Sequence, residues 1–373
     1  MRRPHALLLP FPAQGHVLPL MELAYRMASQ GFTITFINTH FNHARLLSST
    51  TTPPSINFIS IPDGMQPEDD RNDIAELCHA LMTFTSLHLL QLINTMDIQE
   101  SDKPIVTCFI TDEVMAWALD IAKKTGLRSA AFSTASANTF INMRSVYCLI
   151  ELGIINEDDD ACFWAEDKTC KSWLDEQCDN SVIYVAFGSL AILNERQFQE
   201  LALGLELTGR PFLWVIRPDI TGKAATSLLE RFKDVISDRG KVVEWSPQQE
   251  VLAHPALACF ITHCGWNSTM ESVSNGVPFL CWPYFADQHL NQSYIFCDFW
   301  KTGLKMMPDE NGLITKEEIR GKVEELVGDE GMKKRALALK EMAMKSVDKG
   351  GCSFENFMTF INAMKDVLGF GLP

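Results

Sequence analysis

Polar residues able to bind a phosphate follow an apolar stretch in the second half of the chain. The stretch 257–262 reads as a buried strand, and "HCGWNS" (263–268) leads from it into a helical pattern. Its glycine permits a tight turn, and Asn267 or Ser268 is predicted to cap the helix. The N–H groups of a helix N-terminus, with the imidazole of His263 and the Asn267 amide beside them, can bind a phosphate.

Nearby residues suit a nucleotide that carries a sugar. Glu271 lies about one helical turn further on the same face, where its carboxylate can accept hydrogen bonds from a ribose diol. Trp245 ends the preceding strand and offers a flat face for a base, a contact worth about 1–3 kcal/mol. Asp287 and Gln288 begin a further helix and can bond sugar hydroxyls. Taken singly, His263 and Trp245 also fit core packing and Glu271 a solvated helix face, but the combination favours a ligand site.

A second histidine lies near the N-terminus, in "PFPAQGHVLPLMELA" (10–24). His16 follows a glycine where a short apolar run gives way to a helical pattern that begins at about Leu18. An imidazole in such a place can act as a general base, and it can equally be an ordinary loop residue. Its own surroundings in the sequence leave both interpretations open.

Short apolar strands alternate with helices in both halves, which predicts an α/β fold built from parallel sheets. In the first half the predicted strands are 5–10, 32–38, 56–62, 104–111 and 128–134, with helices over 18–30 and 113–126. In the second half they are 181–189, 211–218, 240–247, 256–265 and 277–283, with helices over 194–209, 267–276, from about Asp287, and two at the C-terminal end. This rhythm predicts two Rossmann-like domains with ligand sites at the carboxyl ends of the strands.

Several function classes fit the sequence poorly. A dehydrogenase or P-loop enzyme would need GxGxxG or GxxxxGK after a strand, and neither pattern occurs. The net charge of −15 and the lack of a Lys/Arg cluster argue against a nucleic-acid partner. "DDD" (158–160) could be a DxD metal motif, but it lies in an acidic connection and reads better as a solvated linker.

Composition and length indicate a two-domain globular protein. The chain has 373 residues, 46% hydrophobic and 21% charged. Its 11 cysteines form no CxxC pair, which favours reduced thiols. The start, "MRRPHALLLPFP", imitates a signal peptide but is broken by prolines, and no window reaches the ~20 apolar residues of a membrane span. We therefore expect a soluble, cytoplasmic protein.

The segment 245–288 is also identifiable as a whole. Its pattern W-x-P-Q…H-P…T-H-C-G-W-N-S-x-x-E-S…G-V-P…W-P…D-Q closely resembles the signature box of plant UDP-dependent glycosyltransferases acting on small molecules. The resemblance implies a GT-B fold, in which the two parallel sheets face a cleft. It implies an acceptor-binding domain over residues 1–160 and a UDP-sugar-binding domain over 161–373, with the last helix able to pack back on the first domain.

The resemblance also implies the roles of the donor-site residues. For the nucleotide these are Trp245 against uracil, Gln248 along the nucleotide and Glu271 on the ribose. For the diphosphate they are Ser189, His263, Asn267 and Ser268. For the sugar they are Thr134, Trp266, Asp287 and Gln288. A glutamine at the last of these positions generally accompanies glucose as the donor sugar.

In the first domain the resemblance makes His16 the catalytic base and Asp112, in "CFITDEVMAWALD", its acidic partner. A neutral imidazole that takes a proton from an acceptor hydroxyl accelerates such a reaction about 10²–10⁴-fold. The carboxylate fixes the tautomer, and attack in line with departing UDP inverts the anomeric centre. Neither a metal nor a cofactor is expected, since the helix dipole and His263 can neutralise the leaving group.

The family pattern is interrupted near residues 150–165. There "CLIELGIINEDDD" runs almost directly into "FWAEDKTCKSWLDEQ", whereas the family continues for several tens of residues that supply the last two strands of the first sheet. Their loss would expose the edge of the fifth strand and remove one wall of the acceptor pocket. Two hypotheses result: a monomeric, inverting UDP-glucose-dependent transferase acting on a hydroxyl or carboxyl of a lipophilic plant metabolite, or a catalytically impaired relative that only binds UDP-sugar.

Overall fold

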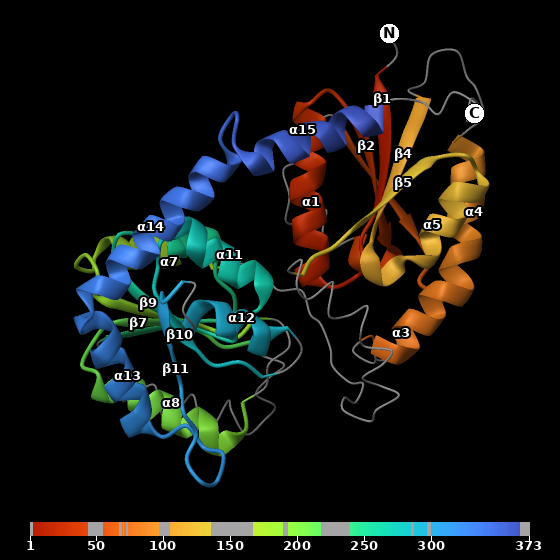
Figure 1. Cartoon of the computed structure of the whole chain (residues 1–373). Helices are drawn as coiled ribbons and strands as arrows, with labels where there is room; N and C mark the ends of the chain where they lie inside the picture. The colour runs from red at the N-terminus through yellow and green to blue at the C-terminus, as the bar shows by residue number, and fades with distance from the viewer. Residues whose placement is uncertain are drawn as a thin grey trace. The chain divides into compact units, whose positions relative to one another are not determined.

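The apolar runs form strands of two parallel sheets, one in each of two units of the computed structural model (Figure 1). The structure describes residues 3–43, 55–66, 69, 71, 74–96, 105–135, 167–188, 193–217, 239–284, 287–296 and 300–365. Unit 1 comprises Met1–Phe163 and Lys349–Pro373, and unit 2 comprises Trp164–Asp348. The predicted α/β fold with two parallel sheets is confirmed.

The sheet of unit 1 has five described strands in the order β3-β2-β1-β4-β5, all parallel. The strands are β1 (Pro4–Leu9), β2 (Thr33–Thr39), β3 (Ile56–Ile61), β4 (Ile105–Asp112) and β5 (Arg128–Phe132). The helices are α1 (Gln14–Ser29), α3 (Ile74–Ala80), the π-helical η1 (Leu81–Thr85), α4 (Ser86–Met96), the 3-10 turn η2 (Glu113–Met115), α5 (Trp117–Lys124) and α15 (Cys352–Lys365). The strand order reverses between β1 and β4, which makes the carboxyl ends of these two strands the expected ligand-binding point.

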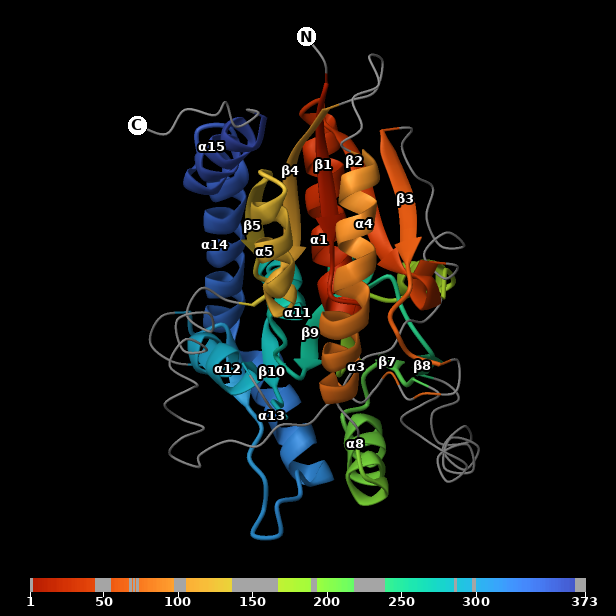
Figure 2. The same ribbon diagram turned by 90° about the vertical axis from the view of Figure 1, so that its right-hand side faces the viewer.

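Alternate residues of β1 point into two separate layers of core. Ala6 and Leu8 pack with α1 and α15 on one face of the sheet, and Leu7 and Leu9 pack with α3, α4 and α5 on the other (Figure 2). From α15, Ile361 contributes a fully buried side chain to the first layer. The C-terminal helix is therefore part of the core of unit 1.

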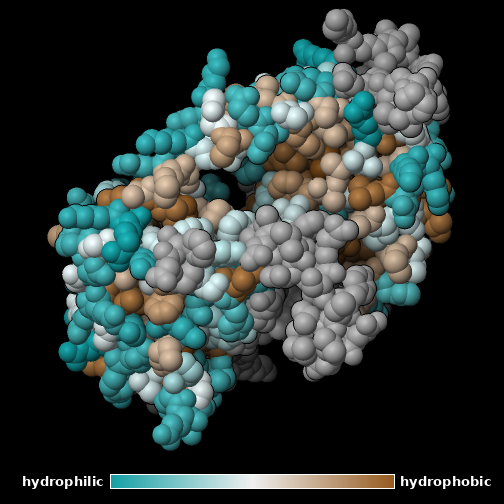
Figure 3. Space-filling model, viewed as in Figure 1, coloured by the Kyte–Doolittle hydropathy of each residue, from teal (hydrophilic) through white to brown (hydrophobic). Residues whose placement is uncertain are grey.

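Strand β5 is less covered than its neighbours. Its residues are half-buried or exposed, whereas β1 and β2 are buried almost throughout. Among the described residues β5 lies at the edge of the sheet, and apolar surface is visible on unit 1 in the space-filling view (Figure 3). The segment near residues 150–165, where the sequence predicts the missing strands, lies outside the described residues.

The sheet of unit 2 has six described strands in the order β11-β10-β9-β6-β7-β8, again all parallel. The strands are β6 (Val182–Ala186), β7 (Phe212–Val215), β8 (Gly240–Val243), β9 (Leu257–Thr262), β10 (Phe279–Cys281) and β11 (Gly303–Lys305). The helices are α7 (Cys170–Asp175), α8 (Glu195–Leu207), α10 (Gln248–Leu252), α11 (Trp266–Asn275), α12 (Gln288–Phe296), α13 (Lys316–Gly328) and α14 (Glu330–Val347). Here the order reverses between β6 and β9, and α8 and α13 pack on one face of these strands, α7 and α10 on the other.

Some element predictions were wrong. The sequence predicts two C-terminal helices, but the described chain has three, because α13 and α14 are separated by Asp329 alone and read as one pattern. The Asp329 side chain accepts a hydrogen bond from the Met332 N–H and so begins a new helix there. The three-residue strand β11 and the helical segment from α3 to α4 were not predicted.

Candidate functional site

His16 and Asp112 meet where the strand order of unit 1 reverses. Helix α1 begins at Gln14, four residues earlier than predicted, so His16 lies in its first turn just after β1. Asp112 is the last residue of β4, the strand beside β1. Its Oδ2 lies 2.8 Å from His16 Nδ1, and its Oδ1 accepts a hydrogen bond of 3.0 Å from the Val114 N–H. The fully buried carboxylate is thus held at both oxygens.

This contact selects one tautomer of His16. A carboxylate can only accept, so Nδ1 carries the hydrogen and Nε2 keeps its lone pair. The His16 side chain is 27% exposed, whereas Asp112 is fully buried. Edge-on packing of Phe11, with ring centroids 5.3 Å apart, further holds the imidazole. The arrangement holds a partly exposed imidazole in a fixed orientation in unit 1.

Three other residues surround this pair. Thr134, predicted to reach the donor sugar, has its Oγ1 3.1 Å from His16 Nδ1. Glu113 accepts a hydrogen bond of 2.8 Å from Ser133 Oγ. Burial, and secondarily the charge of Asp112, raise the pKa of Glu113, while the Ser133 hydrogen bond and His16 oppose the rise. Glu113 and Ser133 were missed by the sequence reasoning, although Glu113 directly follows Asp112.

In unit 2 His263 directly follows β9, at the corresponding reversal of strand order. Its ring lies between two glycines: a Cβ on Gly188 would come within 2.6 Å of the ring, and one on Gly265 would also collide with it. Gly188 also has a φ of +68°, so both space and backbone conformation require glycine there. Burial and, to a smaller extent, the charge of Arg217 lower the pKa of His263 to about 4, whereas a backbone hydrogen bond with Ala186 acts to raise it. His263 is therefore neutral at neutral pH, and its ring carries a single N–H.

Helix α11 begins at Trp266, one residue before the predicted range 267–276. Gly265, with φ −56° and ψ 144°, is the N-cap and makes no side-chain cap hydrogen bond. The prediction that Asn267 or Ser268 caps the helix is wrong, because the extended Gly265 already completes the turn and puts them, with Trp266, in the first helical turn. The positive end of a ten-residue helix is consequently directed at the loop that contains His263.

Gln248, Ser268 and Glu271 are joined by hydrogen bonds. The Gln248 amide, at the first residue of α10, donates to Ser268 Oγ at 2.9 Å and to Glu271 Oε2 at 2.6 Å. Gln249 donates to Glu271 Oε1 at 3.2 Å. Burial raises the pKa of Glu271, and the two amides oppose that rise. Half-buried Trp245 lies two residues beyond the end of β8, which is shorter than predicted.

Asp287 and Gln288 lie at the start of α12, as predicted. The Asn291 amide donates to Asp287 Oδ2 at 2.8 Å and to the Cys264 carbonyl at 3.0 Å, so it ties α12 to the loop after β9. Burial raises the pKa of Asp287, and the bond from Asn291 opposes this. Gln288 accepts from the Tyr284 N–H at 2.8 Å. Cys264 has a φ of +65°, a conformation that costs energy outside glycine.

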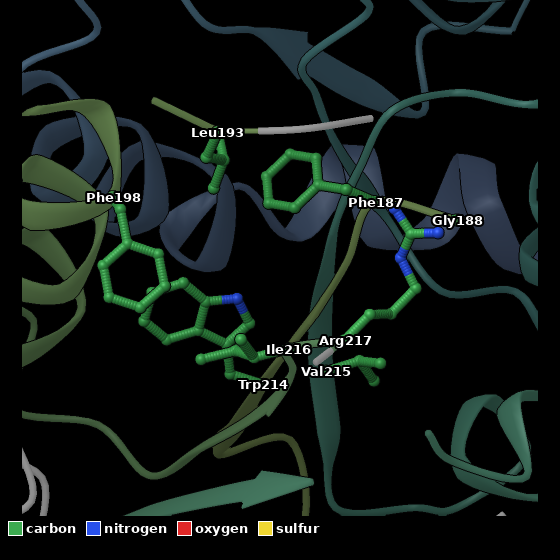
Figure 4. Close-up of a pocket in the computed structure, with 8 residues that line it drawn as sticks. All are labelled: Phe187, Gly188, Leu193, Phe198, Trp214, Val215, Ile216 and Arg217. Atoms are coloured by element: carbon green, nitrogen blue, oxygen red, sulfur yellow. The ribbon is translucent and has the colours of Figure 1, made fainter. Parts of the chain in front are cut away.

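Arg217 is a buried cation that the sequence reasoning missed. It follows β7, is 2% exposed and lines a small cavity together with Phe187, Gly188, Leu193, Phe198, Trp214, Val215 and Ile216. Figure 4 shows its guanidinium at Gly188, the glycine that lies against His263. The available signal was an arginine at the end of the apolar run 211–216.

Some predicted features fall outside these observations. Ser189 and the acidic run 158–160 lie outside the described residues. Within the part of the chain that the structure describes, no group of three or more His, Cys, Asp or Glu side chains could hold a metal ion. No helix of this part is long and apolar enough to cross a membrane.

Comparison with known proteins identifies the family. The family described as UDP-glucoronosyl and UDP-glucosyl transferase matches residues 152–350. UDP-glycosyltransferase 83A1 of Arabidopsis thaliana is 36% identical over 464 residues, covering 98% of this chain and 97% of that protein. The chain belongs to the plant family-1 UDP-glycosyltransferases. Linamarin synthase 1 of Manihot esculenta is 32% identical over 472 residues, covering 96% of each.

Solved structures of such enzymes share the fold. Os79 from O. sativa in complex with UDP superimposes with a TM-score of 0.82 at 23% identity, covering 96% of this chain and 100% of that one. UDP-glucose: anthocyanidin 3-O-glucosyltransferase in complex with UDP gives 0.78 at 23% identity, covering 96% and 98%. The two parallel sheets of this UDP-glycosyltransferase are therefore those of a GT-B fold.

This UDP-glycosyltransferase lacks an internal part of the sequence that an aligned relative has. The alignment with the Arabidopsis protein runs over 464 positions and this chain has 373 residues, so at least the difference, 91 positions, faces gaps in this chain. Because the alignment covers nearly all of both chains, these gaps are internal.

Proposed function

We propose that this UDP-glycosyltransferase transfers glucose from UDP-glucose, with inversion, to a hydroxyl or carboxyl group of a small lipophilic plant metabolite. The observation that carries the proposal is the 2.8 Å contact between His16 Nδ1 and the buried Asp112 carboxylate. Relatives that are 31–32% identical support the acceptor class, since they include linamarin synthase 1 and 7-deoxyloganetin glucosyltransferases.

In the proposed mechanism, His16 is the general base. Its Nε2 takes the proton of the acceptor hydroxyl while Nδ1–H stays on Asp112, which stabilises the imidazolium that forms. The acceptor oxygen then bonds to the anomeric carbon as the bond from that carbon to the UDP oxygen breaks on the opposite side. For a carboxyl acceptor, which is already ionised at neutral pH, the base is not needed and only orientation remains.

We assign donor binding to residues of unit 2 and to Thr134 of unit 1. Trp245 stacks on uracil, and Gln248 and Glu271 hold the nucleoside. Ser189, His263, Asn267 and Ser268 hold the diphosphate, and Thr134, Trp266, Asp287 and Gln288 contact the sugar. The start of α11 and the neutral His263 support this assignment, because N–H donors at a positive helix end stabilise the charge of departing UDP without a metal.

A second function is favoured by one observation. At least 91 positions of the aligned relative have no counterpart in this chain. If they belong to the acceptor pocket, as the interruption near residues 150–165 indicates, the chain binds UDP-sugar without turning it over.

A turnover and binding experiment separates the two functions. The purified chain is incubated with UDP-glucose and a panel of phenolic, terpenoid and carboxylic acceptors, and UDP-induced thermal stabilisation is measured in parallel. We expect glucoside from hydroxyl acceptors and about 10²–10⁴-fold less from His16→Ala. His88→Ala, which removes a histidine of α4, is the control and keeps its activity. Stabilisation without product supports binding alone, and product from hydroxyl acceptors that survives His16→Ala excludes His16 as the base.

A further inference from the structure

A buried tyrosine lies behind the hydrogen-bonded residues of α10 and α11. Tyr184, on β6, is fully buried, and its ring stacks on Phe260 of β9 with centroids 4.8 Å apart. Its hydroxyl lies 2.7 Å from Ser246 Oγ and donates to Gln248 Oε1 at 3.1 Å. A phenol thus reaches from the sheet of unit 2 to the amide that contacts Glu271.

The direction of each bond in this relay can be worked out. Tyr184 has one hydrogen, which it gives to the carbonyl oxygen of Gln248, so the Ser246 hydroxyl donates to the Tyr184 oxygen. The two hydrogens of the Gln248 amide then go to Ser268 Oγ and Glu271 Oε2. A flipped amide would place its carbonyl oxygen against the Glu271 carboxylate, which is repulsive. Tyr184 therefore fixes which end of the Gln248 amide faces Glu271.

We propose that Tyr184 is a positioning residue for nucleotide recognition, and this inference rests on the proposed function. With Gln248 held by Tyr184, the Glu271 carboxylate stays where a ribose diol can donate to it. Ser268 accepts from Gln248, so its own proton is directed elsewhere and can be given to a phosphate oxygen. Tyr184 touches neither the nucleotide nor the sugar; it acts through Gln248.

The test compares the Kd of UDP with that of 2′-deoxy-UDP in the full chain. Tyr184→Phe keeps the ring stacked on Phe260 but removes the donor to Gln248. We expect the preference for UDP over 2′-deoxy-UDP to fall about 3- to 10-fold, as for the loss of one buried hydrogen bond. At saturating UDP-glucose kcat should stay within about twofold, because uniform donor binding affects KM alone.

Further variants separate positioning from packing. In a Gln248→Leu background, Tyr184→Phe should change the UDP preference no further, since the two residues act in series. Ser246→Ala removes only the bond to Tyr184 and should also lower the preference for UDP over 2′-deoxy-UDP, by a smaller factor than Tyr184→Phe. This variant keeps the test available should Tyr184→Phe fold poorly. Tyr25→Phe, at a half-buried tyrosine of α1 in unit 1, is the matched control and should leave the preference unchanged.

The outcomes are distinct. A reduced preference for UDP that vanishes in the Gln248→Leu background supports positioning by Tyr184. An equal weakening of UDP and 2′-deoxy-UDP overturns it and leaves Tyr184 a packing residue, while the proposed function stands. A wild-type chain that binds neither nucleotide overturns both.

Discussion

Replacing Asp112 by Asn tests the proposed catalytic pair, His16 and Asp112, with one atom changed. In the native chain Asp112 Oδ1 accepts from the Val114 N–H and Oδ2 accepts from His16 Nδ1. An asparagine that keeps its oxygen on the Val114 N–H must turn its NH₂ toward His16. Nδ1 then has to be the acceptor, and the hydrogen of a neutral imidazole moves to Nε2, the atom that should take the acceptor proton. If the asparagine amide is flipped the other way, its NH₂ faces the Val114 N–H. Two hydrogen-bond donors then oppose one another in a buried place, which is unfavourable.

The size of the effect follows from this geometry. The wrong tautomer removes base catalysis, worth about 10²–10⁴-fold in rate. Each factor of ten corresponds to about 1.4 kcal/mol, so the barrier should rise by about 3–6 kcal/mol. Loss of the charge that stabilises the imidazolium acts in the same direction. The donor residues assigned to unit 2 are untouched, so the KM of UDP-glucose should change little.

The assay is initial-rate glucosylation of a hydroxyl acceptor found with the panel described above, with UDP-glucose varied. Asp112→Asn should lower kcat by the stated factor at nearly constant KM for UDP-glucose, and the melting temperature reports whether unit 1 remains folded. Asp120→Asn, the same change at an exposed carboxylate of α5, is the matched control. A folded Asp112→Asn enzyme that retains its kcat within about threefold would refute the assigned role of the pair.

Three further predictions concern unit 2. Gly188→Ala should weaken UDP binding at least about tenfold, measured by UDP titration, because a Cβ there displaces His263. Gly31→Ala is the control, since Gly31 has φ +90° and open space around its Cβ. Calorimetry should show for it only the backbone cost of about 1–2 kcal/mol. Asn291→Leu leaves the Cys264 carbonyl and Asp287 without the amide that serves both, so urea unfolding should show a loss of about 2–4 kcal/mol. The pKa of His263 is lowered to about 4 from 6.5, so the unfolded chain takes up its proton first; the contribution of His263 to the unfolding free energy is complete above pH 6.5 and is lost as the pH falls towards 4. Between pH 4 and 6.5, His263→Gln should reduce the slope of the unfolding free energy against pH by the equivalent of about one bound proton. An unchanged slope contradicts the lowered pKa of His263.

The sequence predicted those parts of the fold that depend on local pattern. Strands β1 to β5 and most of β6 to β10 were placed within a few residues, because buried parallel strands are continuous apolar runs bounded by turns. Strand ends were less accurate at the sites: β6 and β8 end earlier than the apolar run suggests. At the carboxyl ends the chain leaves the sheet for the loops that carry the candidate site residues, so an apolar run that continues there no longer marks the strand.

The contacts within the sites could not be read from spacing. His16 and Asp112 are 96 residues apart, and their 2.8 Å contact depends on the pairing of β1 with β4. The buried Arg217 beside His263, and Tyr184 behind Gln248, likewise come from strands whose order is set by the whole sheet. Such contacts reflect register and strand order, which a single sequence specifies only through the completed fold.

The shorter chain should affect the two halves of the reaction unequally. Both reversal points of strand order are present, β1 with β4 in unit 1 and β6 with β9 in unit 2, and each carries its polar residues. Strand β5 is the edge of the sheet among the described residues, next to which the sequence predicts the missing strands, and β4 separates it from β1. We therefore expect a shortened edge to remove acceptor contacts and to leave the pair His16 and Asp112 in place. We expect a raised KM for large acceptors with kcat preserved for small ones, measured over a series of phenols of increasing size; a uniformly low kcat at normal KM would place the defect at the base instead.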